Sequence, residues 1–194
     1  MVLAKANLTL EHREILLKDR PSSLLNISSK GTVPVLYIDN NHIIDESFDI
    51  MIWGIEYAQL DLLKEESQKQ FNMIKTNDND FKYWLDRYKY FDRFPKLTFN
   101  DYQNKCKDYL ITYDKILTDN IYFMGDYLQC IDIGLFPFIR QCANVDYNWF
   151  QNEFTNLNIW LQKILSSKLF LSTMKKYEVW NQTERGLIVN YNDE

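Results

Sequence analysis

The stretch Lys30–Ser47, KGTVPVLYIDNNHIIDES, constrains the fold of this chain more than any other part of the sequence. Val33–Ile38 is rich in β-branched and aliphatic residues, follows Gly31 and ends at Asp-Asn-Asn, a pattern typical of a strand that enters a tight turn. His42–Ile44 is then the returning strand of a hairpin. Pro34 has no N–H for a strand ladder, so we expect it at a strand start, an edge or a bulge.

The residues after this hairpin predict a helix whose start can hold an anion. Asp45–Ser47 opens it, and three apolar residues share one helical face: Phe48, Ile52 and Ile55. A helix N-terminus with a hydroxyl group attracts anions. A cis bond between Val33 and Pro34 would leave the backbone amide and carbonyl of Val33 free for a ligand. These features together suit a small peptide that carries a carboxylate.

This arrangement resembles the glutathione-binding half of soluble bacterial glutathione transferases, through Gly-Thr-Val-Pro-Val-Leu and then Asp-Glu-Ser. In that family the residue before a cis-proline pairs its backbone with the cysteinyl part of glutathione, and the acidic–serine pair holds the γ-glutamyl end. The resemblance implies these roles for Val33, Pro34, Glu46 and Ser47. Arg20 stands where some members place a basic residue that reaches the glycyl carboxylate. The residues alone also fit a plain βαββα core with a capped helix.

The charge and the residue composition argue against several kinds of partner and site. The net charge of −5 argues against nucleic acid as a partner, because nucleic-acid binding depends on basic patches. Three cysteines without a C-x-x-C pair suit a reducing cytoplasm. No apolar run approaches the length of a membrane span, so we expect no membrane partner. The two histidines are too few to suggest a metal site.

The beginning of the chain departs from the family. Met1–Asn7 has the composition of the end of a helix, whereas a family member begins with a strand and a loop that carries the catalytic Cys, Ser or Tyr. We expect this strand and loop to be absent, and we assign no catalytic residue. Either the chain starts at an internal methionine of a longer reading frame, or it is a true variant that closes its sheet differently or borrows a strand from a partner. We favour the first explanation.

The second half of the chain predicts helices. Helical spacing runs through Gln68–Ile74 and Phe81–Tyr90, with the turn-prone Thr76–Asp80 between them. The sequence LDRYKYFDRFP at 85–95 resembles a signature of one bacterial branch of the same family. A second match lies at 122–138, where the family has a capping box at the start of its buried central helix. It implies a structural role for Asp132, although Gln129 replaces the expected Ser or Thr.

We therefore predict a truncated thioredoxin-like α/β domain at residues 1–58, an all-helical domain of the glutathione-transferase type at 67–181 and a loosely ordered polar tail at 182–194. The implied function is conjugation of glutathione to small electrophiles, or glutathione-dependent thiol exchange, by a homodimer that needs no metal. The chain as given is then catalytically incomplete. The alternative is a non-catalytic glutathione-binding or protein-interaction module on the same scaffold.

Overall fold

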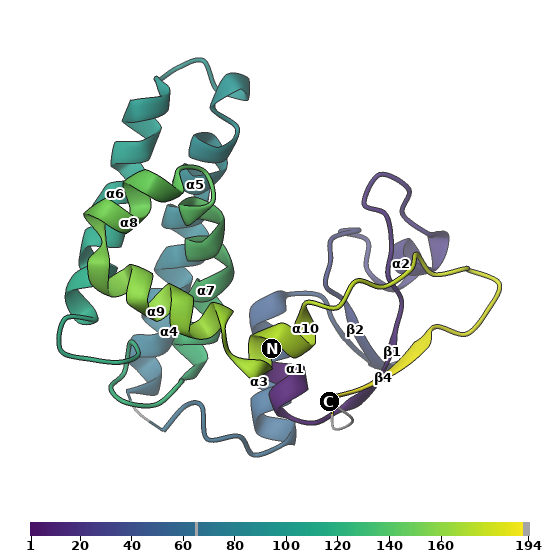
Figure 1. Cartoon of the computed structure of the whole chain (residues 1–194). Coiled ribbons are helices and arrows are strands. Elements are labelled where there is room, and N and C mark those ends of the chain that lie inside the picture. Colours follow the sequence, from purple (N-terminus) through teal and green to yellow (C-terminus); the bar gives the residue numbers. More distant parts are fainter. Residues whose placement is uncertain (65, 192–194) are drawn as a thin grey trace. The chain divides into compact units, whose positions relative to one another are not determined.

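The computed structural model describes residues 1–64 and 66–191, and these form two compact units (Figure 1). The first, here called the α/β unit, combines Met1–Leu60 with the chain from Lys168 onward. The second, the helical unit, is the continuous segment Asp61–Ser167. The predicted fold class, a small α/β part followed by a helical part, is confirmed.

The α/β unit holds short elements from both ends of the chain. In chain order they are α1 (Val2–Lys5), β1 (Thr9–His12), α2 (Ser22–Ile27), β2 (Leu36–Asp39), β3 (His42–Ile44), α3 (Ser47–Tyr57), α10 (Lys168–Thr173) and β4 (Leu187–Asn190).

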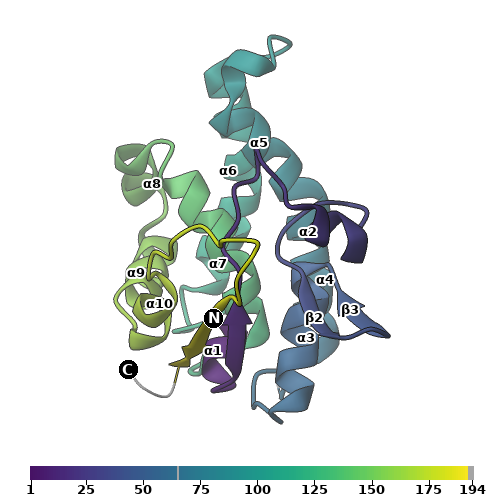
Figure 2. The same cartoon turned by 90° about the vertical axis from the view of Figure 1, so that its right-hand side faces the viewer.

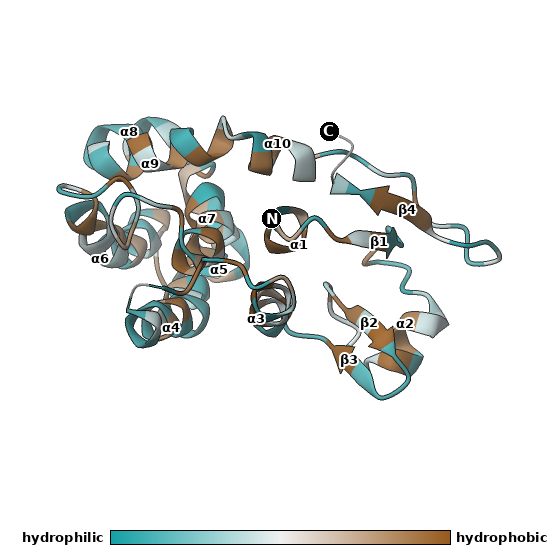
Figure 3. Cartoon of the chain, turned by 90° about the horizontal axis from the view of Figure 1, so that it is seen from below, coloured by the Kyte–Doolittle hydropathy of each residue, from teal (hydrophilic) through white to brown (hydrophobic). Residues whose placement is uncertain are grey.

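The strands of this unit form two separate antiparallel pairs, β1 with β4 and β2 with β3 (Figure 2). The β2–β3 hairpin agrees with the sequence prediction, except that β2 begins at Leu36, two residues beyond Pro34. Part of the expected loose tail at 182–194 forms a strand instead, because Leu187–Asn190 form β4, and its residues 192–194 lie outside the described residues. Strand β4 is coloured as hydrophobic along part of its length in Figure 3.

A glycine allows β4 to approach β1. A Cβ atom on Gly186 would lie 2.7 Å from the carbonyl oxygen of His12, which is far below normal contact. The Gly186 N–H donates to the Glu11 carboxylate at 3.0 Å, and Arg13 also contacts this carboxylate at 2.7 Å. Any larger residue at Gly186 must push the start of β4 away from β1.

The small core of the α/β unit forms where α1 packs against α3 and α10. Val2 and Ala4 are buried from α1. Gly54 lets α1 come close, since a Cβ there would lie 3.0 Å from side-chain atoms of Val2 and Leu3. The buried residues of α3 are Ile50, Gly54 and Ile55. Phe48 and Ile52, which were expected to share a helical face with Ile55, are only partly buried.

The helical unit contains α4 (Ser67–Thr76), a π-helical turn (Asn77–Phe81), α5 (Lys82–Lys89), a 3₁₀ turn (Phe91–Arg93), α6 (Phe99–Ile116), α7 (Cys130–Ala143), α8 (Tyr147–Glu153) and α9 (Thr155–Leu165). Within residues 1–64 and 66–191, no helix is both long and apolar enough to cross a membrane.

The helix interruption predicted at Thr76–Asp80 is wrong. Asn77–Phe81 continue the helix from α4 into α5 with one wider turn. Asn77 and Phe81 are fully buried, and the ring of Phe81 lies 6.2 Å from that of Tyr113 in an edge-to-face contact. Packing of this turn into the core outweighs the turn preference of its polar residues.

Helix α7 is the centre of the helical unit and packs against α4, α5, α8 and α9. Its start is fixed by the Asp132 carboxylate, which is completely buried. One carboxylate oxygen accepts the Phe123 N–H at 3.1 Å and the Trp160 indole N–H at 2.8 Å. The other accepts the Gln129 N–H at 2.9 Å. These three donors join α7, α9 and the preceding loop around one charge.

Burial raises the pKa of Asp132 to about 6, although the hydrogen bonds to its carboxylate act in the opposite direction. A carboxyl group whose pKa is higher in the folded than in the unfolded chain binds its proton more tightly when folded. Its contribution to stability is therefore greatest below the unfolded pKa of about 4 and is lost as the pH rises through the folded pKa of about 6.

We predict a corresponding pH effect for the Asp132→Asn variant. The difference in unfolding free energy, wild type minus variant, should fall by about 1–3 kcal/mol between pH 4 and pH 7, since only the wild type titrates at this site. Urea unfolding followed by tryptophan fluorescence measures this difference. A difference that stays constant or grows with pH would contradict the raised pKa.

Candidate functional site

The β2–β3 hairpin positions the residues expected to bind a ligand. Its register pairs Leu36 with Ile44 and Tyr37 with Ile43. The turn is closed by the Asp39 carboxylate, which accepts the Asn41 N–H at 2.8 Å. This is the side-chain-to-backbone bond that makes Asp and Asn favourable in tight turns.

Val33 and Pro34 lie just before this hairpin. The peptide bond between them is cis. Both residues are exposed, Val33 by 47%. Because β2 starts only at Leu36, the backbone of Val33 lies outside the strand ladder.

Glu46 and Ser47 lie at the other end of the hairpin, at the start of α3. Glu46 has an extended backbone, with φ −113° and ψ 131°, and its carbonyl accepts the Ile50 N–H at 3.0 Å. Ser47 is therefore the first helical residue of an 11-residue helix. Both side chains are exposed. A carboxylate ligand here would face the positive end of the helix dipole.

Arg20 lies beside the turn that leads to Val33. Gly31 occupies that turn with a φ of +60°, and a Cβ atom on it would lie 3.3 Å from Cδ of Arg20. The sequence separates these two residues, and the structure brings them together. Arg20 is exposed, so its guanidinium is accessible to a ligand.

A cluster around Lys30 was not predicted from the sequence. The Lys30 ammonium donates to Asp45 at 2.9 Å and to Glu46 at 2.6 Å, and Ser28 donates to the second oxygen of Asp45 at 2.8 Å. The bonds with Glu46 and Asp45 raise the pKa of Lys30 to about 12. The bonds from Lys30 and Ser28 lower the pKa of Asp45. The sequence offered only opposite charges 15 and 16 residues apart, which does not indicate contact.

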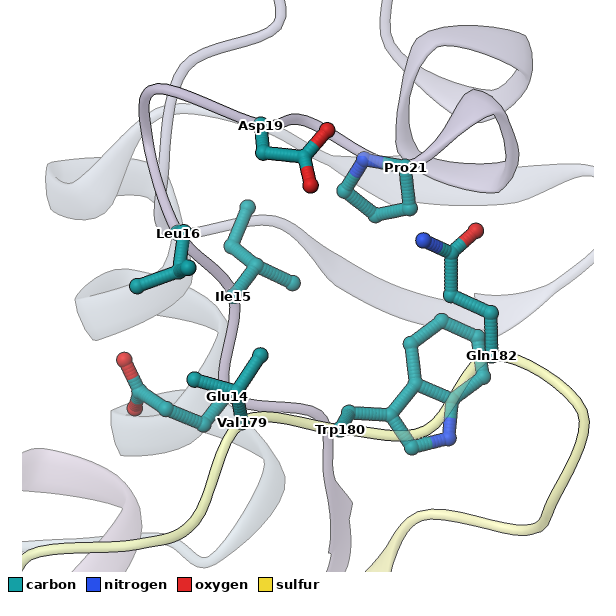
Figure 4. Close-up of a pocket in the computed structure, with 8 residues that line it drawn as sticks. All are labelled: Glu14, Ile15, Leu16, Asp19, Pro21, Val179, Trp180 and Gln182. Atoms are coloured by element: carbon teal, nitrogen blue, oxygen red, sulfur yellow. The ribbon is translucent and has the colours of Figure 1, made fainter.

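The α/β unit also has a small cavity, of about 40 Å³. Figure 4 shows the side chains of Ile15, Asp19, Pro21, Trp180 and Gln182 around it. This volume is far below the roughly 300–1,000 Å³ of typical ligand pockets, so we do not assign the ligand to it. A cavity of about 200 Å³ in the helical unit is lined mainly by apolar side chains. Its polar lining residues are Asn120, Asn156 and Lys163.

The three cysteines do not offer a reactive thiol. Cys106, Cys130 and Cys142 all lie in the helical unit and are fully buried. Burial raises the pKa of Cys130 to about 12, and a hydrogen bond with Cys106 raises that of Cys142. A thiol in such surroundings stays protonated and is a poor nucleophile. Among the residues that the structure describes, no group of three His, Cys, Asp or Glu side chains could hold a metal ion.

The comparison with protein families identifies the first part of the chain. The model of the glutathione S-transferase N-terminal domain matches residues 1–57, which contain Arg20, Val33, Pro34, Glu46 and Ser47. No curated protein is similar enough in sequence to count as a relative.

Solved structures show the same fold over most of the chain. A glutathione transferase family member from Pseudomonas fluorescens with two glutathione bound is 16% identical, with a TM-score of 0.75 over 88% of this chain and 83% of that one. The transferase URE2P6 from Phanerochaete chrysosporium, in complex with oxidized glutathione, is 16% identical, with a TM-score of 0.74 over 88% and 85%. BphK, a bacterial enzyme of this kind solved as a ternary complex, is 18% identical, with a TM-score of 0.73 over 89% and 90%.

These identities are too low to transfer a reaction, and they establish the fold alone. With the match to the N-terminal domain, they confirm the resemblance that the hairpin motif indicated. The first 57 residues of the chain therefore match the N-terminal domain of the glutathione S-transferases, and most of the chain has the fold of these proteins.

Proposed function

We propose that this protein binds glutathione at the hairpin site and uses it as the substrate of a transfer to a small electrophile or of a thiol exchange. One observation carries the proposal. Within the segment that matches the N-terminal domain, Glu46 and Ser47 form the start of an 11-residue helix directly after the hairpin that Val33 and Pro34 precede. Glutathione bound to two of the similar structures supports this choice of ligand.

Each end of the tripeptide has a group of suitable chemistry. The backbone of Val33, outside the strand ladder, suits the amide and carbonyl of the cysteinyl residue. The hydroxyl of Ser47 and the helix start suit the γ-glutamyl α-carboxylate. The Glu46 carboxylate suits the α-ammonium group, and Arg20 suits the glycyl carboxylate.

We predict that glutathione binds in the millimolar range or better, because each charge-assisted hydrogen bond contributes roughly 1.5–3 kcal/mol. Glu46→Ala and Ser47→Ala should each weaken binding about tenfold, by the loss of one such bond. Isothermal titration calorimetry measures both. The matched control is Glu56→Ala, which removes an exposed carboxylate from the same helix. Absence of binding by the folded wild type would contradict the proposal.

Conjugation requires the thiolate of glutathione to attack the second substrate. Thiol exchange requires a protein thiol that exchanges with glutathione. An activating Ser or Tyr would favour conjugation, and a catalytic Cys would favour thiol exchange. The buried thiols of the helical unit do not suit the second role. We therefore propose that the 194-residue chain binds glutathione without a complete catalytic site.

The purified chain should then catalyse the conjugation of glutathione to a general aryl halide no faster than the uncatalysed background. Absorbance of the thioether product, recorded with and without protein at equal glutathione, measures this rate. Robust turnover would contradict the incomplete site. The triple variant with Cys106, Cys130 and Cys142 replaced by alanine would then show whether one of these thiols is the nucleophile.

We also propose that the protein is a cytoplasmic homodimer. Free cysteines support a reducing compartment. Large apolar side chains exposed on the α/β unit support self-association, because burying them against a second copy would be favourable: Leu16, Leu17, Tyr37, Ile38 and Ile43. Light scattering at micromolar concentration should give the mass of a dimer. A monomer mass across this range would contradict the assembly.

A further inference from the structure

The carboxylate of Glu46 contacts an ammonium group of the chain itself. Lys30 Nζ lies 2.6 Å from one oxygen of Glu46 and 2.9 Å from one oxygen of Asp45. Ser28 fixes the other oxygen of Asp45 at 2.8 Å. The side chain of Lys30 therefore bridges two neighbouring carboxylates at the start of α3.

A ligand with an α-ammonium group would need the same carboxylate. Two ammonium groups carry equal charge, so they repel each other when both lie against one carboxylate. The α-ammonium of the ligand and Lys30 therefore compete for the charge of Glu46, because holding both cations against one carboxylate costs their mutual repulsion. Asp45 offers Lys30 a second partner, which it retains if it leaves Glu46.

We propose that Lys30 is an internal competitor for Glu46, which an incoming ligand ammonium must displace. Lys30 then lowers the affinity of the site for glutathione and for other ligands with an α-amino group, and Asp45 keeps the displaced lysine nearby. This inference rests on the proposed glutathione site and adds to it a residue that sets its affinity.

The effect must be modest. The Lys30 and Glu46 side chains are 48% and 60% exposed, so water and salt screen their attraction. Exposed ion pairs of this kind correspond to about two- to fivefold in a binding constant. Removing the charge of Lys30 also makes the site more negative, which disfavours an anionic ligand regardless of competition. A test must separate these two consequences.

A pair of ligands separates them. Glutathione carries the α-ammonium group, and its analogue with a glutaryl group in place of γ-glutamyl lacks only that group. Calorimetry gives the dissociation constants of both for the wild type and for Lys30→Met, which keeps the length of the side chain without its charge. The ratio of the analogue's constant to that of glutathione reports the effect of Lys30 on the ammonium group. The two ligands differ by one charge, so the general effect of losing a lysine charge on this ratio is taken from Lys176→Met.

Competition predicts that this ratio rises about two- to fivefold in Lys30→Met. It should stay at the wild-type value in Lys30→Arg, which keeps a cation, and in Lys176→Met, which removes an exposed lysine from the segment after α10. Circular dichroism confirms that each variant is folded. If glutathione binds but the ratio is unchanged or lower in Lys30→Met, competition is wrong and the proposed site stands. If no folded variant binds glutathione, the proposed function itself is wrong.

Discussion

The α/β unit depends on the antiparallel pairing of β1 with β4. β1 has four residues, and an isolated strand of this length has no backbone partners of its own. Its partner comes from the far end of the chain, and the two are joined by the Glu11 carboxylate, which accepts the Gly186 N–H 175 residues away. The β2–β3 hairpin, which carries the candidate site, belongs to a separate strand pair.

The hairpin and its helix could be predicted from the sequence because their signals are local. Asp39 and Asn41 make the turn, and His42–Ile44 form a strand with the predicted bounds. The partner of β1 could not be predicted, since strand pairing over such a separation leaves no local pattern. Gly186 followed by Leu-Ile-Val was the available signal for β4, and its surrounding polar residues concealed it.

The helical unit shows where packing overrules local preference. The polar run around Asn77 predicts a turn, yet burial of Asn77 and Phe81 keeps the chain helical. At the candidate site, the motif residues Glu46 and Ser47 could be identified from the sequence. The ion pair of Glu46 with Lys30 could not, because it depends on how the loop before the hairpin folds back onto α3. A motif indicates candidate ligand-binding groups, whereas the ion pairs of those groups with residues distant in the sequence appear only in three dimensions.

The order of segments along the chain has a consequence for biosynthesis. The whole helical unit, Asp61–Ser167, lies between the two parts of the α/β unit, so the ribosome must deliver it before β4 can reach β1. Domains generally fold as they emerge, the amino-terminal one first. Here the helical unit can fold before β1 has its strand partner β4. Closing the long loop between β1 and β4 then adds an entropic cost that grows only slowly with the length of the loop. The unit that contains the match to the glutathione S-transferase N-terminal domain is therefore completed last.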